Sequence, residues 1–250
     1  MDQAVLRDDM VDSLEHPSKG VVRSDELGIA MRTVPREHFV PDGEPAYADR
    51  EHRTIGTTVF APSTVARLFE ALELGPSQTT LIVGSGVGYT AAIAAEIAGG
   101  TFVHAIDLSH EIVYEARANL SRAGYDSVLV LQADGAHGLA EYAPYDRILV
   151  ETAISRPPVA LLDQLTGNGR LVAPIGSGVQ ELSAFHDGAI VDQYGTIAVE
   201  PMLVAGEQAG AIERNRTARE DREYADRALQ RRQIKERRWI DWETDHHHGR

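Results

Sequence analysis

Blocks of apolar residues along the chain switch between the spacing of strands and the spacing of helices. From residue 80 onward, short apolar runs such as 80–83 (TLIV) lack a period-two alternation, and most are followed by a segment with helical spacing. Such runs are typical of strands buried on both faces of a parallel sheet. The predicted strands are 80–84, 101–107, 127–134, 145–153, 170–176, 182–188 and 196–206, and the predicted helices are 89–98, 109–124 and 157–165. This order predicts a doubly wound α/β domain with a mostly parallel sheet.

The first third of the chain carries a different pattern. Helices with a break between them are predicted in 5–34, where Ser24 is expected to cap the second one. A proline-rich stretch, 34–50, predicts an ordered but irregular arm. A further helix is predicted over 63–74. Its expected buried side chains are Val65, Leu68, Phe69 and Leu72.

The composition changes near residue 206. The last segment, 207–250, is dense in Arg, Glu and Asp and poor in apolar residues before Trp239 and Trp242. It is predicted to form a charged, solvated helix, or alternatively a lid or partner-binding helix that docks through those tryptophans. The chain therefore divides into an N-terminal helical and substrate-loop region (1–62), an α/β core (63–206) and a charged C-terminal extension (207–250).

The formal net charge of −14 and the absence of cysteine exclude several classes of function for this protein. Sequence-independent binding to nucleic acid needs a basic surface that displaces counterions, so nucleic acid is not an expected partner. Without cysteine there is no disulfide, no thiolate ligand and no cysteine nucleophile, and no metal site is predicted. No window is apolar over the roughly 20 residues of a membrane helix, and the acidic N-terminus lacks a signal-peptide pattern. We therefore expect a cytoplasmic protein that does not bind membranes.

A glycine-rich turn joins the strand at 80–84 to the next helix. Glycine stands at Gly84, Gly86 and Gly88. The dinucleotide fingerprint requires glycine where Tyr89 stands, and no phosphate-binding lysine follows as in a P-loop. The first two glycines allow the backbone to turn and approach a ligand closely, and the following helix offers free N–H groups. A tight packing corner without a ligand is the alternative for this turn.

Two aspartates end the next two predicted strands. Asp107 follows the glycines by about 20 residues, and Asp134 ends the strand after that. Doubly wound folds bind ligands at the carboxyl ends of their strands, and an acidic residue at the first of these positions accepts hydrogen bonds from ribose. The combination predicts a pocket for a nucleoside without phosphates. Among common cofactors, S-adenosylmethionine fits best, and the reaction is then methyl transfer.

Several motifs in a fixed order carry a resemblance to a known family. They include VPREHFVP, VGSGVGYTAA, VHAID, APYDRILVETA and VEPMLVAG. Over about residues 8–206 the chain resembles the protein-L-isoaspartate O-methyltransferase family. The resemblance implies S-adenosylmethionine as the cofactor, with the glycine turn at its methionine side, Asp107 at its ribose and Asp134 at its adenine. The cofactor-binding residues that it implies are Gly84, Ser85, Gly86, Gly88, Asp107, Leu108, Asp134 and Gly135.

The chain departs from the family pattern at two positions. Ile82 stands where the family has an acidic residue, which removes a charge that supports the turn or the amine of the cofactor. Phe60 stands where a family serine contacts the substrate carboxylate. The remaining candidates for a hydroxyl that contacts the acceptor are Thr57, Thr58 and Ser63.

The resemblance implies a carboxyl methyltransferase that acts on L-isoaspartyl residues of damaged proteins or peptides. A carboxylate with a pKa near ~4 is ionised at neutral pH, so its attack on a methyl group needs no general base. Phe60 leaves two alternatives open. One is a methyltransferase for an aspartate of a dedicated ribosomally made peptide or another carboxylate acceptor. The other is a non-catalytic protein that keeps the cofactor fold.

Overall fold

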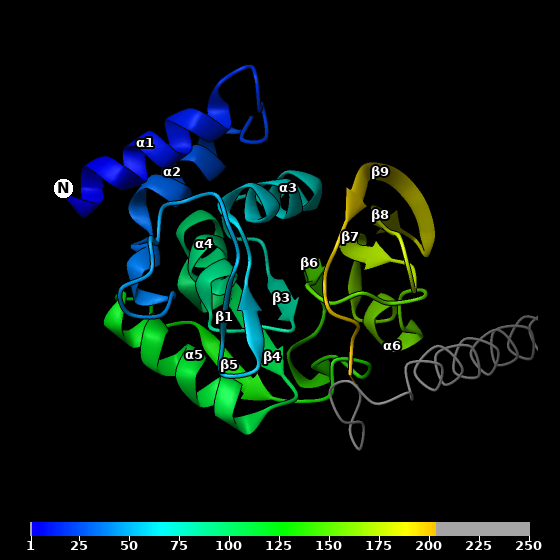
Figure 1. Cartoon of the computed structure of the whole chain (residues 1–250). Coiled ribbons are helices and arrows are strands. Elements are labelled where there is room, and N and C mark those ends of the chain that lie inside the picture. The colour runs from blue at the N-terminus through cyan, green and yellow to red at the C-terminus, as the bar shows by residue number, and fades with distance from the viewer. Residues whose placement is uncertain (1, 204–250) are drawn as a thin grey trace, which may run out of the picture.

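The computed structural model describes residues 2–203, so the predicted charged helix in 207–250 lies outside the described residues. A seven-stranded sheet forms the centre of the molecule, in the order β5-β4-β3-β6-β7-β8-β9 (Figure 1). Neighbours from β5 to β7 are parallel, whereas β8 and β9 are antiparallel. Its strands are β3 (Thr80–Val83), β4 (Val103–Asp107), β5 (Leu129–Gln132), β6 (Tyr145–Val150), β7 (Leu165–Ile175), β8 (Gln180–His186) and β9 (Ala189–Ile197). The prediction of a doubly wound, mostly parallel α/β domain is confirmed.

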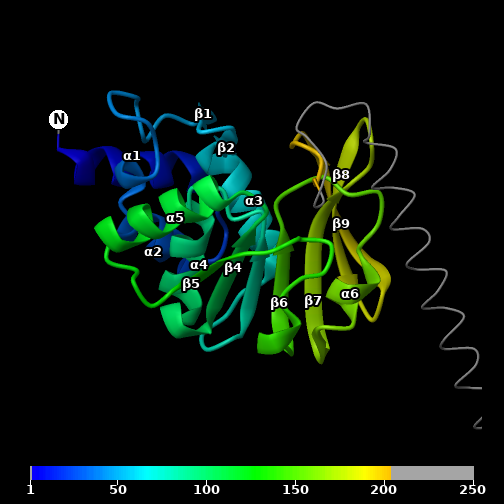
Figure 2. The ribbon, with the colours of Figure 1, turned by 90° about the horizontal axis from the view of Figure 1, so that it is seen from below.

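Both faces of the central strands are buried, as their continuous apolar runs predict. On β3, Ile82 packs into the core under helices α1 to α5, while Leu81 and Val83 pack into a second core on the opposite face, with residues of α6. Figure 2 shows α6 next to β7, away from α1 and α2. The helices are α1 (Gln3–Glu15), α2 (Asp25–Thr33), α3 (Pro62–Leu72), α4 (Tyr89–Ala98), α5 (His110–Arg122) and α6 (Val159–Leu162), with 3-10 turns η1 (Arg36–His38), η2 (Gly100–Phe102) and η3 (Ala140–Tyr142). In residues 2–203, no helix is both long and apolar enough to cross a membrane.

The carboxyl ends of β3, β4 and β6 are level with one another. Val83 pairs with Ile106 of β4 on one side and with Val150 of β6 on the other. The residues that follow these strands therefore meet at one edge of the sheet. This edge is the place where the glycine turn and Asp107 come together.

Two elements at the end of the domain differ from the predicted ones. The helix predicted over 157–165 covers only Val159–Leu162, and the chain enters β7 at Leu165. The buried Gln164 side chain between them hydrogen-bonds the backbone of Leu139 and His137. The strand predicted over 196–206 is wrong at residues 198–203, since β9 ends at Ile197 and instead starts at Ala189, and residues 204–206 lie outside the described residues. Most side chains of β9 are exposed, so this edge strand lacks the apolar run by which a strand is recognised.

The N-terminal region holds the substrate loop in place. Ser24 stands at the start of α2 without capping it, since its hydroxyl donates to Glu70 instead. Arg36, in the proline-rich arm, is fully buried and donates to the carbonyl oxygens of Ala46 and Phe60, both at 2.7 Å. The arm is thus ordered, as predicted, and it fixes the backbone at Phe60. The predicted burial of α3 is confirmed for Val65, Leu68, Phe69 and Leu72.

A short hairpin, which the sequence pattern did not indicate, precedes Phe60. It consists of β1 (His52–Thr54) and β2 (Thr57–Val59), paired antiparallel. Ile55 and Gly56 form its two-residue turn, with φ of 40° and 79°. Positive φ at both positions is the geometry of a type I′ turn. The predicted substrate loop is therefore a β-hairpin that ends next to the carboxyl edge of the sheet.

Candidate active site

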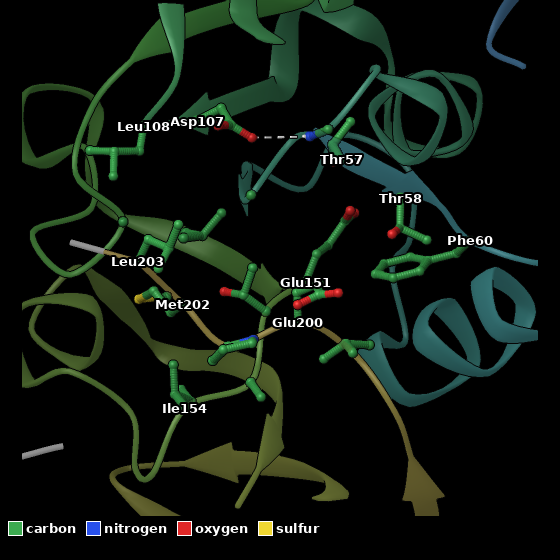
Figure 3. A pocket seen from close by; sticks show the side chains of 18 of the residues that line it. Thr57, Thr58, Phe60, Asp107, Leu108, Glu151, Ile154, Glu200, Met202 and Leu203 are labelled. Atoms are coloured by element: carbon green, nitrogen blue, oxygen red, sulfur yellow. Dashed lines mark hydrogen bonds between the residues drawn. The ribbon is translucent and has the colours of Figure 1, made fainter. Parts of the chain in front are cut away.

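A cavity of about 810 Å³ opens at the carboxyl ends of β3, β4 and β6. This is the edge at which doubly wound sheets bind ligands, and the volume is typical of small-molecule pockets. The β1–β2 hairpin and residues 198–203, which are far apart in sequence, complete its lining. Figure 3 shows side chains from all these segments around one space. The cavity is therefore assembled mainly from the sheet edge, the β1–β2 hairpin and the last described segment.

Two of the predicted glycines form the turn that borders the cavity. Gly84 and Gly86 have φ of 87° and 48°, and both line the cavity. The N–H groups of Gly84 and Ser85 both donate to Ile106 O at 2.9 Å, which ties the turn to β4. A Cβ atom on Gly86 would lie 3.4 Å from Thr57 Oγ1. Glycine here lets the turn approach the hairpin closely.

The other two predicted residues of the turn lie behind it. Gly88 has a φ of 94°, and a Cβ atom there would lie 3.2 Å from Leu120 Cγ of α5. Gly88 therefore allows α5 to pack closely against the turn, which is the alternative role considered for these glycines. Ser85 is buried, and its hydroxyl has no hydrogen-bond partner among the described residues. Neither residue is part of the cavity lining.

Asp107 lies at the predicted position, at the end of β4 and in the cavity wall. One carboxylate oxygen accepts the N–H of Gly86 at 3.3 Å and the other accepts the N–H of Ser109 at 3.1 Å. Burial raises the pKa of the Asp107 carboxyl, while the N–H donors that bind it act in the opposite direction. The carboxylate is thus fixed between the glycine turn and the start of α5, with its side chain toward the cavity (Figure 3).

The residues predicted for the adenine end separate into two groups. Leu108 and Gly135 line the cavity. A Cβ atom on Gly135 would lie 2.6 Å from Val83 Cγ1, so the loop crosses the end of β3 too closely for any larger residue. Asp134 is not part of the cavity lining, and its Oδ1 accepts the N–H of Ala136 at 2.9 Å. The structure thus brings the loop backbone to the cavity and uses the Asp134 side chain to shape that loop.

Only some of the side chains predicted to contact the acceptor lie in the cavity wall. Thr57, Thr58 and Phe60 line the cavity, whereas Ser63 does not. The N–H and the hydroxyl of Ser63 bind the carboxylate of Asp49. In Figure 3, Thr57 lies beside the hydrogen bond between Asp107 and the glycine turn, and Thr58 lies next to Phe60. Thr58 is therefore the candidate hydroxyl nearest the part of the cavity that faces away from the nucleoside end.

An ion pair, which sequence analysis did not identify, joins two walls of the cavity. Arg53 of β1 and Glu200 of the last described segment lie 3.2 Å apart, with 74% and 57% of their side chains exposed. The backbone of that segment is held on the other side, where Ala153 N donates to Glu200 O and Met202 N donates to Ala153 O. Further lining residues that were not predicted include Glu51, Ile55, Ile112, Thr152, Ile154, Gln180 and Met202.

A second carboxyl group in the cavity was also missed. Glu151 directly follows β6, and only 6% of its surface is exposed. Burial raises its pKa to about 8; the charge of Asp107 raises it too, and a hydrogen bond with Thr90 opposes both effects. The reasoning that identified Asp107, an acidic residue at a strand end, applies equally to Glu151. Within residues 2–203, no cluster of three or more His, Asp or Glu side chains is placed to hold a metal ion.

The geometry fits S-adenosylmethionine. Asp107 presents a carboxylate for ribose hydroxyls, Leu108 and Gly135 offer a flat apolar surface for a base, and the glycine turn offers close backbone approach. The rest of the cavity continues to Thr58 and Phe60, so a second molecule has room beyond the nucleoside (Figure 3). A cavity that joins these two sets of residues suits transfer of a group between two ligands.

Comparisons with known proteins agree with this geometry. A family model described as protein-L-isoaspartate(D-aspartate) O-methyltransferase matches residues 6–198. A relative named protein-L-isoaspartate O-methyltransferase from Koribacter versatilis is 40% identical over 66% of this chain and 74% of its own length. One of the same name from Methanocella arvoryzae is 41% identical over 69% of this chain and 96% of its own length.

Solved structures show the same fold. One named protein-L-isoaspartate O-methyltransferase has a TM-score of 0.70 at 29% identity, over 84% of this chain and 69% of its own. Another, titled as a putative enzyme of this kind from Plasmodium falciparum in complex with S-adenosyl-L-homocysteine, has a TM-score of 0.70 at 21% identity, over 79% of this chain and 98% of its own. The extent of the family match is the deciding finding, and the chain belongs to the protein-L-isoaspartate O-methyltransferase family.

Proposed function

We propose that this protein transfers the methyl group of S-adenosylmethionine to the carboxylate of L-isoaspartyl residues in proteins, which begins their repair. The observation that carries the proposal is a single cavity that joins Asp107 and the glycine turn to Thr58 and Phe60 on the hairpin. The family match supports the same activity and makes the chain a methyltransferase, so the non-catalytic alternative is set aside.

The residues at the sheet edge bind the cofactor. Asp107 accepts hydrogen bonds from the ribose hydroxyls, and Leu108 and Gly135 contact the base. Gly84 and Gly86 lie along the methionine side. When bound, the cofactor supplies a methyl group on a positively charged sulfur, which departs as a neutral thioether.

The residues of the β1–β2 hairpin and Phe60 orient the acceptor. The acceptor carboxylate is already ionised at neutral pH, so no side chain has to remove a proton. Thr58 donates a hydrogen bond to one carboxylate oxygen and leaves the other free to attack the methyl carbon. Phe60 excludes water from this side of the cavity, which strengthens the remaining polar contacts.

The product chemistry accounts for repair. Methylation converts a carboxylate into an ester, which the backbone nitrogen of the following residue attacks with loss of methanol. The resulting succinimide opens by hydrolysis in two directions, one of which gives an ordinary aspartyl linkage. The enzyme thus has to form only the ester, and this needs no general acid or base in the cavity.

Phe60 favours a second candidate function. An aromatic side chain in this position offers an apolar surface to the residue that flanks the acceptor, where a serine would offer a hydrogen bond. An ordinary aspartate in a dedicated peptide is then the acceptor, and the succinimide is the product. Both candidates use the same cofactor site and the same ester, so they differ only in the peptide that enters beside Thr58 and Phe60.

Transfer of labelled methyl to a matched pair of peptides separates the two. One peptide carries an isoaspartyl residue and the other carries aspartate at the same position. Selective labelling of the isoaspartyl peptide is the expected result. Selective labelling of the aspartyl peptide would support the second candidate, and labelling of neither, with S-adenosylmethionine bound, would contradict the proposed acceptor.

A further inference from the structure

The Glu151 carboxyl has an unused oxygen inside the cavity wall. Its Oε1 atom is buried and has no hydrogen-bond partner among the described residues. A buried polar atom without a partner costs free energy, and an ionised carboxylate costs far more. Most buried carboxyl groups are therefore matched by donors. The unpaired oxygen of Glu151 thus points to a donor that is not among the described residues.

The surroundings of Glu151 place this oxygen beside the glycine turn. Val83 pairs with Val150, so Glu151 is the next residue along β6 and stands beside Gly84. Its N–H donates to Val83 O at 2.9 Å, and a Cβ atom on Gly84 would lie 3.7 Å from Glu151 Cβ. Figure 3 shows the Glu151 side chain in the space between Asp107, Thr58 and Phe60. The carboxyl therefore lies between the nucleoside end and the acceptor end of the cavity.

The cavity lining holds four carboxyl groups, Glu51, Asp107, Glu151 and Glu200, and one cation, Arg53, which pairs with Glu200. Thr90 of α4 hydrogen-bonds the Glu151 carboxyl, and Asp107 is the ionised group that acts on it. Ile82, on the neighbouring strand, is fully buried and contributes no charge. This excess of carboxyl groups over cations favours a ligand that brings positive charge. An acceptor carboxylate does not meet this requirement, whereas an ammonium group does.

We propose that the Glu151 carboxylate binds the ammonium group at the methionine end of the cofactor. Asp107 then accepts hydrogen bonds from the neutral hydroxyl groups of the ribose, and Glu151 binds the cation. The inference depends on the cofactor and not on the acceptor, so it can fail while the proposed acceptor holds, and the reverse. It also makes Glu151 a residue that distinguishes ligands with the amino acid part from ligands without it.

Ligand binding then changes the protonation of Glu151. In the empty protein, burial raises the pKa of this carboxyl to about 8, so it is mainly protonated at pH 7. An ammonium group in contact lowers the pKa and displaces the proton. Binding of a ligand that carries the ammonium group therefore releases a proton below pH 8, and its affinity rises as the pH approaches 8.

Calorimetric titration with S-adenosylhomocysteine and with 5′-methylthioadenosine, which lacks the amino acid part, tests the proposal. Glu151→Gln keeps the size of the side chain and removes the charge. We expect this substitution to lower the affinity for S-adenosylhomocysteine roughly 10- to 100-fold, the range of charged hydrogen bonds. The affinity for 5′-methylthioadenosine should stay within about twofold of the wild-type value. Asp126→Asn, at an exposed position, is the matched control and changes neither.

Proton release is measured with wild-type protein in buffers of different ionisation enthalpy, so it does not depend on a variant that folds. We expect release with S-adenosylhomocysteine at pH 7 and none with 5′-methylthioadenosine. An equal fall in the affinity for both ligands in Glu151→Gln would overturn the proposal, and so would an unchanged affinity for both. Unchanged ligand affinity with a raised KM for the acceptor would instead assign Glu151 to the acceptor.

Discussion

The two ends of the cavity are built in different ways. The cofactor end consists of residues that directly follow strands of one sheet, and its two carboxyl groups, Asp107 and Glu151, are held by the interior of the protein. The acceptor end combines the β1–β2 hairpin, whose strands have three residues each, with residues 198–203. An exposed ion pair between Arg53 and Glu200 joins the two segments. The sheet holds the residues of the cofactor end in place before any ligand binds, whereas the acceptor end is formed by side chains near the surface.

This difference suits the two ligands. A small cofactor gains affinity from groups that are already in place, because ordering them on binding would cost free energy. An exposed ion pair contributes under about 1 kcal/mol, so separating Arg53 from Glu200 to admit a peptide costs little. An enzyme that acts on one residue type in many proteins needs a rigid site for the donor and an adaptable one for the acceptor.

The largest expected effect concerns the buried carboxyl of the cofactor end. Its pKa is raised from 4.5 to about 8, so between these pH values the folded protein holds a proton that the unfolded chain releases. The free energy of unfolding therefore falls as the pH rises from 4.5 to 8. We expect Glu151→Gln to lack this loss and to be more stable than the wild type at pH 9 by about 3 to 5 kcal/mol.

Urea unfolding between pH 5 and pH 9 measures this difference. Glu200→Gln at the acceptor end is the matched control, since 57% of its side chain is exposed. We expect its free energy of unfolding to stay within about 0.5 kcal/mol of the wild type at every pH. Parallel curves for the wild type and Glu151→Gln would show that the buried carboxyl does not titrate with folding.

The next largest effect tests the proposed ribose contact. Asp107→Ala removes the acceptor for two ribose hydroxyls and leaves the N–H groups of Gly86 and Ser109 without their partner. We expect the affinity for S-adenosylhomocysteine and for 5′-methylthioadenosine to fall at least about 100-fold each. Calorimetry provides both values. A fall in the affinity for S-adenosylhomocysteine alone would show that Asp107 contacts the amino acid part of the cofactor and not the ribose.

A smaller effect separates the two threonines of β2. Thr58→Val removes the hydroxyl beside Phe60, and we expect kcat/KM for an isoaspartyl peptide to fall about tenfold with cofactor affinity unchanged. Thr57→Val changes a side chain that touches the glycine turn, so it should affect cofactor affinity more than KM for the peptide. Steady-state kinetics and calorimetry on both variants provide the comparison. The opposite assignment of effects would place the acceptor on the Thr57 side.

The cofactor end could be predicted well because its signals are local. Each central strand is a continuous apolar run, and the residue after it lies at the sheet edge whatever else the chain does. Gly84, Gly86 and Asp107 follow from this rule, Leu108 and Gly135 were implied by the family resemblance, and all five line the cavity. Glu151 obeys the same rule, but its importance depends on how deeply its neighbours bury it, and burial is a property of the assembled fold.

The acceptor end was harder to predict because its parts meet only in three dimensions. The strands of the hairpin have three residues each and mixed polarity, which is too short to show a period. Ser63 looked equivalent to Thr58 in sequence, and the bond to Asp49 that holds it away from the cavity is visible only in the structure. The pairing of Glu200 with Arg53 spans most of the chain, so no local pattern indicates it.

The smallest effect concerns the turn of the hairpin. Ile55 has a φ of 40°, which is unfavourable for a β-branched residue, while Asn and Gly are the residues that type I′ turns prefer. Ile55→Asn should therefore raise the free energy of unfolding by about 0.5 to 1 kcal/mol, or Tm by about 2 °C. Ile55→Val, which keeps the branch, is the control and brings no such gain. Because Ile55 lines the cavity, a rise in Tm together with a raised KM for the peptide would show that the strained side chain contacts the acceptor. A rise in Tm without a change in KM would show that the strain belongs to the turn alone.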